Sequence, residues 1–233
     1  MSSADHFTPL SKLPNFDPRQ IPVLGVDAHL PAVPAAELQP AALRQRFAAP
    51  PLWQPEVRVE PRFTRRAPAA AAVLLPIVAH PQPTLLLTQR TSHLRDHSGQ
   101  IAFPGGKTDV GDVDAIMTAL REAEEEVGLT ADFVQVLGTL PSYTTGSAFI
   151  ITPVVALVRP GFTLRPHPGE VAEVFEVPLA FLMDPAHHRR HRLVAEGLQR
   201  DWFSMPYRDP LAERFIWGAT AGMLRNLYRL LAA

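Results

Sequence analysis

A regular pattern of apolar and polar positions begins near residue 69 of the chain. The nearly continuous apolar run at 71–79 predicts a buried strand, and residues 83–88 predict its hairpin partner across a turn at 80–82. Short apolar or alternating segments predict further strands at 100–103, 134–140, 149–158, 171–177, 192–194 and 202–206. Pro153 predicts that its strand lies at a sheet edge or carries a bulge, because proline cannot donate a ladder hydrogen bond.

Two longer segments carry apolar residues at helical spacing. The first follows Asp112 and Asp114, either of which could cap the helix, and it ends at Gly128. The second is predicted over Ala212–Leu230, and its apolar face consists of Phe215, Ile216, Ala219, Met223, Leu227 and Leu230. Residues 178–183 predict a short helix. Strands mixed with two main helices predict an α/β sandwich.

The first 70 residues differ from the rest, because they contain 12 of the 25 prolines. Proline fixes its own φ and removes a backbone donor, so we expect little regular structure here, with one short helix within 31–47. Trp53 and Phe63 could anchor the segment. The segment is either a partly disordered leader or a lid or dimer arm. We therefore expect a Pro/Ala-rich extension over 1–65 and a main domain over 66–233.

Composition narrows the class of protein. The 233 residues carry 22 basic and 23 acidic side chains, so a basic excess typical of nucleic-acid binding is absent. The chain has no cysteine, which excludes disulfides and thiol catalysis. No apolar run has the roughly 18 residues of a membrane-spanning helix. The N-terminus lacks the pattern of a secretion signal. We expect a cytoplasmic protein that binds neither nucleic acid nor membrane.

The helix that ends at Gly128 contains a cluster of acidic residues that could bind a metal ion. Glu122 and Glu126 are four residues apart and Glu125 is three from Glu122, so their side chains converge over one turn. Clustered carboxylates favour Mg²⁺ or Mn²⁺, and protein-bound Mg²⁺ often completes its shell with water and substrate phosphates. The alternative is an ordinary solvated helix face. Gly105-Gly106 upstream and Gly128 at the helix end favour a metal site.

This segment resembles the Nudix box, G-x5-E-x7-R-E-U-x-E-E-x-G-U, where U is aliphatic. The matching positions are Arg121, Glu122, Glu125, Glu126, Gly128 and Leu129, with Ala123 as a small substitute for U. Fourteen residues separate Gly106 from Arg121, where the general box has thirteen. The first glutamate position falls on Val113, so the first acid is displaced to Asp112 or Asp114, or is absent. The resemblance implies an α/β/α sandwich with a mixed sheet.

The segment from Leu86 to Gly106 resembles the signature L-L-T-x-R-(S/T)-x-x-L-R-x-H-x-G-x-x-x-F-P-G-G of the coenzyme A pyrophosphatase branch of Nudix hydrolases. This resemblance implies hydrolysis of coenzyme A or acyl-coenzyme A to adenosine 3′,5′-bisphosphate and a 4′-phosphopantetheine product, with Mg²⁺ or Mn²⁺. Arg90, Arg95 and His97 are the implied phosphate-binding residues, since arginine suits bidentate phosphate binding. Arg90 and Arg95 could instead cap a loop or pair with Asp96.

The implied roles at the box are as follows. Glu122 and Glu126 are the first candidates for metal ligands, and Glu125 is a third ligand or a base. Arg121 is expected to hold the glutamates in place, and Gly105 and Gly106 to bring the backbone close to phosphate or metal. A general base could also lie outside the box. Glu170 and Glu173 are the candidates, unless they form a solvated strand face.

Several alternatives remain open on the sequence. Other substrates include ADP-ribose, NADH and nucleoside triphosphates, and a non-catalytic nucleotide sensor is a second class. All three clustered glutamates are present, which favours the enzyme. The basic run from His187 to Arg192 is a candidate anion or metal site, or a solvated loop in an exposed turn. A homodimer is also possible.

Overall fold

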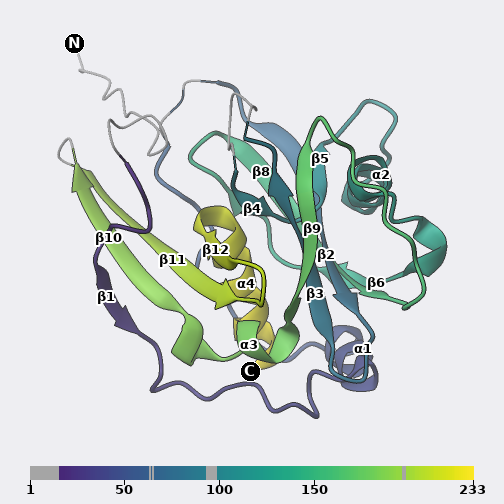
Figure 1. The fold of residues 1–233 in the computed structure, drawn as a ribbon, viewed down its shortest axis with the longest axis horizontal. Helices are drawn as coiled ribbons and strands as arrows, with labels where there is room; N and C mark the ends of the chain where they lie inside the picture. Colours follow the sequence, from purple (N-terminus) through teal and green to yellow (C-terminus); the bar gives the residue numbers. More distant parts are fainter. Residues whose placement is uncertain (1–15, 63, 65, 93–98, 196–197) are drawn as a thin grey trace.

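The computed structural model of the chain describes residues 16–62, 64, 66–92, 99–195 and 198–233 (Figure 1). The strands in this part of the chain are β1 (Val23–Val26), β2 (Ala69–Val78), β3 (Thr84–Arg90), β4 (Ile101–Ala102), β5 (Gly105–Lys107), β6 (Val134–Thr139), β7 (Tyr143–Thr144), β8 (Phe149–Val158), β9 (Val171–Pro178), β10 (Arg189–Ala195), β11 (Leu198–Arg208) and β12 (Glu213–Trp217). The helices are α1 (Pro40–Ala48), α2 (Ala115–Val127), α3 (Leu179–Leu182) and α4 (Gly218–Leu231), with 3₁₀ turns at Ala131–Phe133 and Pro185–His187.

Within the described residues, the larger sheet has eight strands, which run in both directions. Strand β2 pairs in parallel with β8 and antiparallel with β3 and β5. Alternate residues of β2 point to opposite faces, so Leu74 joins an apolar cluster with Ala119 and Ala123 of α2. Leu75 joins a second cluster that contains Leu224 of α4. The sheet is therefore covered by α2 on one face and α4 on the other, as the predicted α/β/α sandwich requires.

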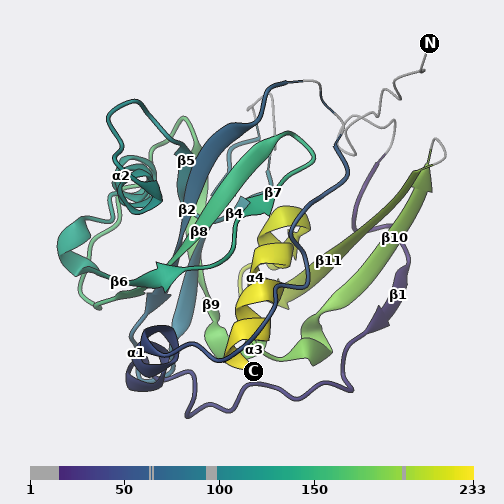
Figure 2. The same cartoon turned by 180° about the vertical axis from the view of Figure 1, so that it is seen from behind.

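A second sheet lies beyond α4, in the order β1-β10-β11-β12 (Figures 1 and 2). Helix α4 is enclosed between the two sheets, and most of its side chains are buried, including the polar Arg225 and Asn226. A helix buried on all sides must be apolar or have its polar groups paired. Arg225 satisfies this requirement with ion pairs to Asp27 and Glu56, at 2.9 and 2.7 Å.

Two predictions about secondary structure are wrong. The predicted helix over Ala212–Leu230 begins too early, because Glu213–Trp217 forms β12 and pairs with β11. Helix α4 starts only at Gly218, whose φ of 62° breaks the extended backbone at a position that favours glycine. For Pro153, the edge alternative is also wrong, and the register shift nearby lies in the partner strand β6, between Val136 and Gly138. Strand β8 is internal, and Pro153 lies where its antiparallel partner changes from β7 to β6.

The described part of the N-terminal segment is integrated into the domain. Helix α1 is the short helix expected here, and it buries Leu43, while Val33 and Leu38 before it are also buried. Trp53 packs against the same apolar cluster, and Phe63 lies outside the described residues. Asp27 and Glu56 reach across to α4. Within the described residues, no helix is long and apolar enough to cross a membrane.

Candidate active site

The acidic helix is fixed at both ends. Asp114 caps the start of α2, with its carboxylate accepting from the Met117 amide at 2.8 Å. Gly128 ends the helix at a φ of 73°, and its amide donates to the Glu124 carbonyl. The amides of Arg165 and His167 then donate to the carbonyls of Val127 and Glu126, each at 2.8 Å. These contacts set the position of the glutamates relative to the sheet.

Strand β5 brings two glycines against the glutamates. The Gly105 amide donates to Glu126 Oε2 at 3.1 Å. A Cβ on Gly106 would lie 2.4 Å from the carboxyl carbon of Glu122, so a side chain there would displace that carboxylate. Gly105 has a φ of 155°, and a Cβ would meet the Ala72 carbonyl oxygen at 2.4 Å. The glycine pair therefore allows a backbone strand to contact two carboxylates directly.

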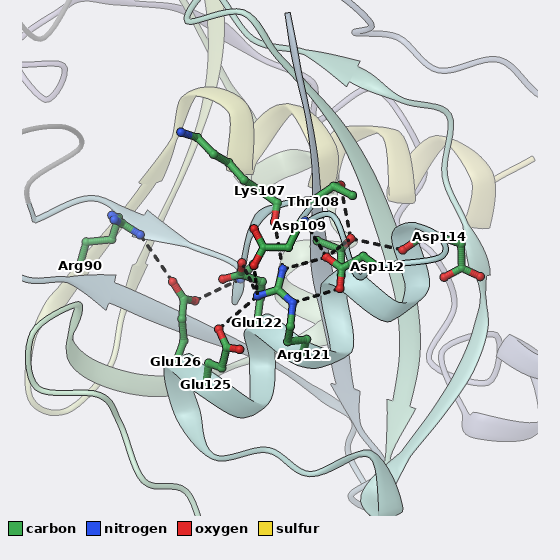
Figure 3. A network of polar contacts seen from close by, with 12 residues as sticks. Arg90, Lys107, Thr108, Asp109, Asp112, Asp114, Arg121, Glu122, Glu125 and Glu126 are labelled. Atoms are coloured by element: carbon green, nitrogen blue, oxygen red, sulfur yellow. Dashed lines mark hydrogen bonds and ion pairs between the residues drawn. The ribbon is translucent and has the colours of Figure 1, made fainter.

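Arg121 is the centre of a polar network between the helix and the preceding loop (Figure 3). Its guanidinium donates to Glu122 Oε1 at 2.9 Å and to Glu125 Oε2 at 3.1 Å. It also donates to the Lys107 carbonyl at 3.0 Å and to both carboxylate oxygens of Asp112. This arrangement supports the expected role of Arg121 in holding the glutamates.

The two aspartates near the first acid position have different contacts. Asp114 caps the helix, whereas Asp112 pairs with Arg121 and accepts from the Thr118 hydroxyl at 3.0 Å. The hydrogen bonds from Arg121 lower the pKa of Asp112 well below its usual range. Val113 between them is exposed. The lengthened loop thus directs Asp112 to the arginine, a contact that sequence spacing did not reveal.

Glu122 and Glu126 are both crowded and desolvated. Burial raises the pKa of Glu126 to about 7, against the opposing effects of the Gly105 amide and the Arg90 charge. Burial also raises the pKa of Glu122, against the opposing effect of Arg121, and the negative charges of Glu125 and Glu170 add to that shift. The Arg90 guanidinium lies 3.7 Å from Glu126 Oε1 and has its Nε buried without a hydrogen-bond partner. The site holds more negative charge than its own cations neutralise.

The two candidate bases outside the helix have different environments. Glu173 is on β9 and forms two hydrogen bonds with Arg214, at 2.6 and 2.7 Å. These bonds lower the pKa of Glu173 and engage both of its oxygens. Glu170 precedes β9, and its charge acts on both Glu122 and Glu126. Its amide donates to the His167 carbonyl at 3.0 Å, in the loop that contacts the end of α2. Of the two candidates, Glu170 is therefore the one whose charge acts on the acidic cluster.

Comparison with known proteins identifies the family. Residues 66–197 match the NUDIX domain. The chain belongs to the Nudix family. It is 45% identical over 157 residues to an uncharacterized Nudix hydrolase, NudL, of Photorhabdus laumondii, covering 67% of this chain and 82% of that protein. NudL of Escherichia coli K12 is also described as an uncharacterized Nudix hydrolase. It is 42% identical over 177 residues, covering 76% of this chain and 88% of that protein.

Among solved structures, a Nudix hydrolase from M. Smegmatis, RenU, is similar at a TM-score of 0.43 and 26% identity. The similarity covers 52% of this chain and 78% of that chain. Nudix hydrolases act on phosphoric anhydrides in nucleoside diphosphate derivatives, and they generally use divalent metal ions. The chain is accordingly a Nudix hydrolase.

The residues present fit a divalent ion. In the part of the chain that the structure describes, no group of three or more His, Asp or Glu side chains is arranged to hold a metal by itself. Mg²⁺, however, is commonly held by one or two carboxylates together with water and substrate phosphates. Glu122 and Glu126 are the suitable pair, because both are largely buried and under-neutralised. Glu125 is more exposed, and its contact is with Arg121 (Figure 3).

The remaining predicted residues of this Nudix site divide into two groups. Arg95 and His97 lie outside the described residues. The prediction that the basic run from His187 to Arg192 forms an exposed turn is wrong, because most of the run forms β10. His188 and His191 are buried, and Arg190 pairs with Asp27 at 2.8 Å. Its partners Asp27 and Glu56 come from the proline-rich segment, where no local pattern indicated paired carboxylates.

Proposed function

We propose that this Nudix hydrolase cleaves the diphosphate linkage of coenzyme A or acyl-coenzyme A, giving adenosine 3′,5′-bisphosphate and 4′-phosphopantetheine or its acyl form. The observation that carries the proposal is the position of Arg90. It belongs to the Leu86–Gly106 signature, and its guanidinium approaches Glu126 on the acidic helix. A signature arginine and a box glutamate thus face the same space, where a phosphate could bind between a cation and a metal-bound carboxylate.

The reaction is hydrolysis of a phosphoric anhydride. Water attacks one phosphorus, the bond from that phosphorus to the bridging oxygen breaks, and the bridging oxygen leaves with the second phosphate. A divalent ion held by Glu122 and Glu126 would supply positive charge to the phosphoryl oxygens and increase the acidity of water. Arg90 would bind a non-bridging oxygen, which needs a donor with its remaining N–H groups available. We propose that Arg95 and His97 provide further phosphate contacts.

We propose Glu170 as the base that accepts the proton from the attacking water. Its charge acts on both Glu122 and Glu126, so it is the candidate outside the helix that is electrostatically coupled to the proposed metal ligands. Glu173 is unsuitable because its two oxygens are bound to Arg214. Glu125 would then support Arg121 and the metal from the rim of the site. A base positioned by hydrogen bonds typically contributes about 10²–10⁴-fold to rate.

The extension over residues 1–65 is proposed to complete the catalytic domain at 66–233. Its carboxylates Asp27 and Glu56 pair with cations on β10 and α4. Removing residues 1–65 would leave Arg225 buried without those partners. A stable truncated protein with full turnover would contradict this assignment.

The test of the substrate is release of adenosine 3′,5′-bisphosphate from coenzyme A with Mg²⁺ or Mn²⁺, measured beside ADP-ribose and NADH. Glu126→Gln should abolish turnover. Glu124→Gln is the matched control, since Glu124 lies on the same helix but is exposed. Preferential hydrolysis of ADP-ribose or NADH would reject coenzyme A as the substrate while retaining the metal-dependent diphosphatase.

A further inference from the structure

A cavity of about 240 Å³ lies where the ends of β3, β4 and β12 meet the N-terminal segment 16–19. It is on the face of the large sheet opposite α2. Arg90 faces Glu126 and α2, so its neighbour Gln89 points to the other face of β3. Glu173, the cross-strand partner of Gln89, contacts Arg214 of β12 on that same side.

The cavity is nevertheless close to the proposed diphosphate site. Gln89, in its wall, directly precedes Arg90 in β3. The Arg90 amide donates to the carbonyl of Gln100, another wall residue, at 2.9 Å. Gln100 is five residues before Gly105, whose amide binds Glu126. One ligand could therefore bind its diphosphate beside α2 and pass around the ends of β3 and β4 into the cavity.

The cavity wall is mostly polar, with Asp17 and Glu213 among its residues, and it also presents three aromatic side chains. Phe16, Phe215 and Trp217 all line it, and the rings of Phe16 and Trp217 have centroids 6.0 Å apart. The Arg19 guanidinium lies 5.5 Å from the centroid of Phe215. Gln89 adds an amide group that can both donate and accept. Flat faces beside polar groups are suited to a heteroaromatic ring, because every nucleobase presents a π-face and a hydrogen-bonding edge.

The volume limits the part of a substrate that could enter. Pockets for whole small molecules usually span about 300–1,000 Å³, so this cavity suits a fragment such as one ring system. A flexible chain such as a pantetheine arm offers only isolated amide planes and no ring to match the aromatic walls. The base of the substrate is the better fit.

We propose that this cavity binds the nucleobase of the substrate while the diphosphate lies at α2. This proposal rests on the proposed function, because it requires a substrate that is a nucleoside diphosphate derivative. It assigns Phe16, Arg19 and Gln89 to base recognition. The N-terminal segment would then contribute directly to specificity, and its Phe16 would supply a wall that the residues of the matched NUDIX domain alone do not complete.

The test uses the full-length chain and three probes: adenosine 5′-monophosphate, ribose 5-phosphate and pantetheine. Binding is measured by calorimetry for the natural protein and for Phe16→Ala, Phe16→Tyr and Phe47→Ala. Phe47 is a partly buried phenylalanine of α1 and serves as the matched control. Loss of one stacked base typically corresponds to about 1–3 kcal/mol, or roughly a five- to hundredfold change in Kd.

We expect Phe16→Ala to weaken adenosine 5′-monophosphate binding within that range and to leave ribose 5-phosphate binding unchanged. Phe16→Tyr and Phe47→Ala should retain binding. Unchanged adenosine 5′-monophosphate binding in Phe16→Ala would overturn the proposal, as would a selective loss of pantetheine binding. Tryptophan emission of the natural protein gives a measurement that needs no variant. Adenosine 5′-monophosphate, but not ribose 5-phosphate, should quench it through stacking near Trp217, and equal responses to the two probes would count against a base site.

The two proposals can fail separately. If coenzyme A is not hydrolysed but adenosine 5′-monophosphate binding depends on Phe16, the substrate assignment is wrong and the base site stands. If coenzyme A is hydrolysed with the same KM in Phe16→Ala and in the natural protein, the base site is wrong and the substrate assignment stands.

Discussion

Arg121 donates to both oxygens of Asp112, at 3.1 and 2.9 Å, across the loop that separates the glycine strand from the acidic helix. The same guanidinium contacts Glu122 and Glu125. Asp112 therefore determines how the arginine is presented to the glutamates, although it is not itself directed at Glu122 or Glu126. Of the two aspartates beside the first acid position, Asp112 is thus the one that contacts the arginine.

Asp112→Asn should reduce metal-dependent activity roughly ten- to a hundredfold, the usual cost of removing a group that orients a metal ligand. The asparagine amide cannot accept two hydrogen bonds from Arg121 as the carboxylate does. Asp114→Ala is the comparison. It should cost about 0.5–2 kcal/mol of stability through loss of the helix cap, with a smaller effect on metal dependence. Metal titrations of activity and thermal melts of both variants separate the two roles.

Gly105 and Gly106 should respond differently to substitution by alanine. Gly106→Ala places a Cβ against the Glu122 carboxylate, a side-chain end that can move, so the fold should survive while metal affinity falls. Gly105→Ala places a Cβ against the backbone of Ala72 and Val73, which cannot move easily, so we expect a lower melting temperature. Circular dichroism melts with parallel activity measurements test this; equal melting temperatures for both variants would argue against it.

Glu126 should destabilise the metal-free protein at high pH. Its pKa is about 7 in the folded state, above the value of roughly 4.3 in an unfolded chain, so the folded state binds more protons between these values. Stability is therefore lost as the pH rises through this window. Without metal at pH 8, Glu126→Gln should be roughly 1–3 kcal/mol more stable than the natural protein.

Added Mg²⁺ should stabilise the natural protein at pH 8 but not Glu126→Gln, because an ion that binds only the folded state raises its stability. Glu124→Gln should behave as the natural protein does in both conditions. Thermal melts at pH 5 and pH 8, with and without Mg²⁺, provide the measurement. Equal Mg²⁺ stabilisation of all three proteins would exclude Glu126 as a ligand.

Glu170→Gln should mainly reduce activity, whereas Glu173→Gln should mainly reduce stability. The first should lower kcat by roughly 10²–10⁴-fold while leaving stability nearly unchanged. The second should keep most activity but cost about 1–2 kcal/mol of stability, since buried Arg214 loses a charged partner. Full activity in Glu170→Gln would show that the base lies elsewhere.

His188 should make the protein sensitive to mild acid. Burial lowers its pKa to about 4. Its Nε2 pairs with the Leu182 carbonyl, and its Nδ1 faces a nitrogen of Arg225. Nδ1 must therefore accept a hydrogen bond, which requires the neutral ring. The unfolded histidine has a pKa near 6.5, so the unfolded state binds more protons between pH 6.5 and 4, and stability falls as the pH drops through that window.

Protonation linked to His188 should lower the free energy of unfolding by on the order of 3 kcal/mol when the pH is lowered from 6.5 to 4. In part of this range Glu126 has the opposite effect, because its protonation stabilises the folded state as the pH falls. The effect of His188 is therefore measured as the difference in stability between the natural protein and a His188 variant. Urea unfolding of the natural protein and of His188→Gln at several pH values isolates it. Parallel stability curves for the two proteins would contradict the assignment.

The parts of the site that were predictable are local in sequence. Glu122 and Glu126 share a helix face because they are four residues apart, and Gly128 ends the helix because it accepts a positive φ. Glu170 reaches the cluster through a loop bonded to the end of α2, which no local pattern encodes. The roles of Asp112 and Asp114 likewise depend on which one meets Arg121.

In the fold, too, the features set by local sequence were predictable and those set by distant contacts were not. The apolar run of β2 predicted a buried strand because both of its faces are covered. Phe215 and Ile216 fitted a helical pattern that continued into α4, but their pairing with β11 made them a strand. Strand β1 was missed because all four of its residues are exposed and leave no periodic signal. Tertiary partners, not local preference, decided these segments.

The pairing of Arg225 with Asp27 and Glu56 also bears on the order in which the chain can fold. Tyr228, on the same helix, donates to the carbonyl of Pro31, a partner 197 residues away in sequence. Contacts of such long separation form slowly because a large loop must close first. During synthesis, Asp27, Pro31 and Glu56 are made long before their partners on α4. These contacts must therefore wait until α4 has left the ribosome, and the proline-rich segment is fixed in place only then.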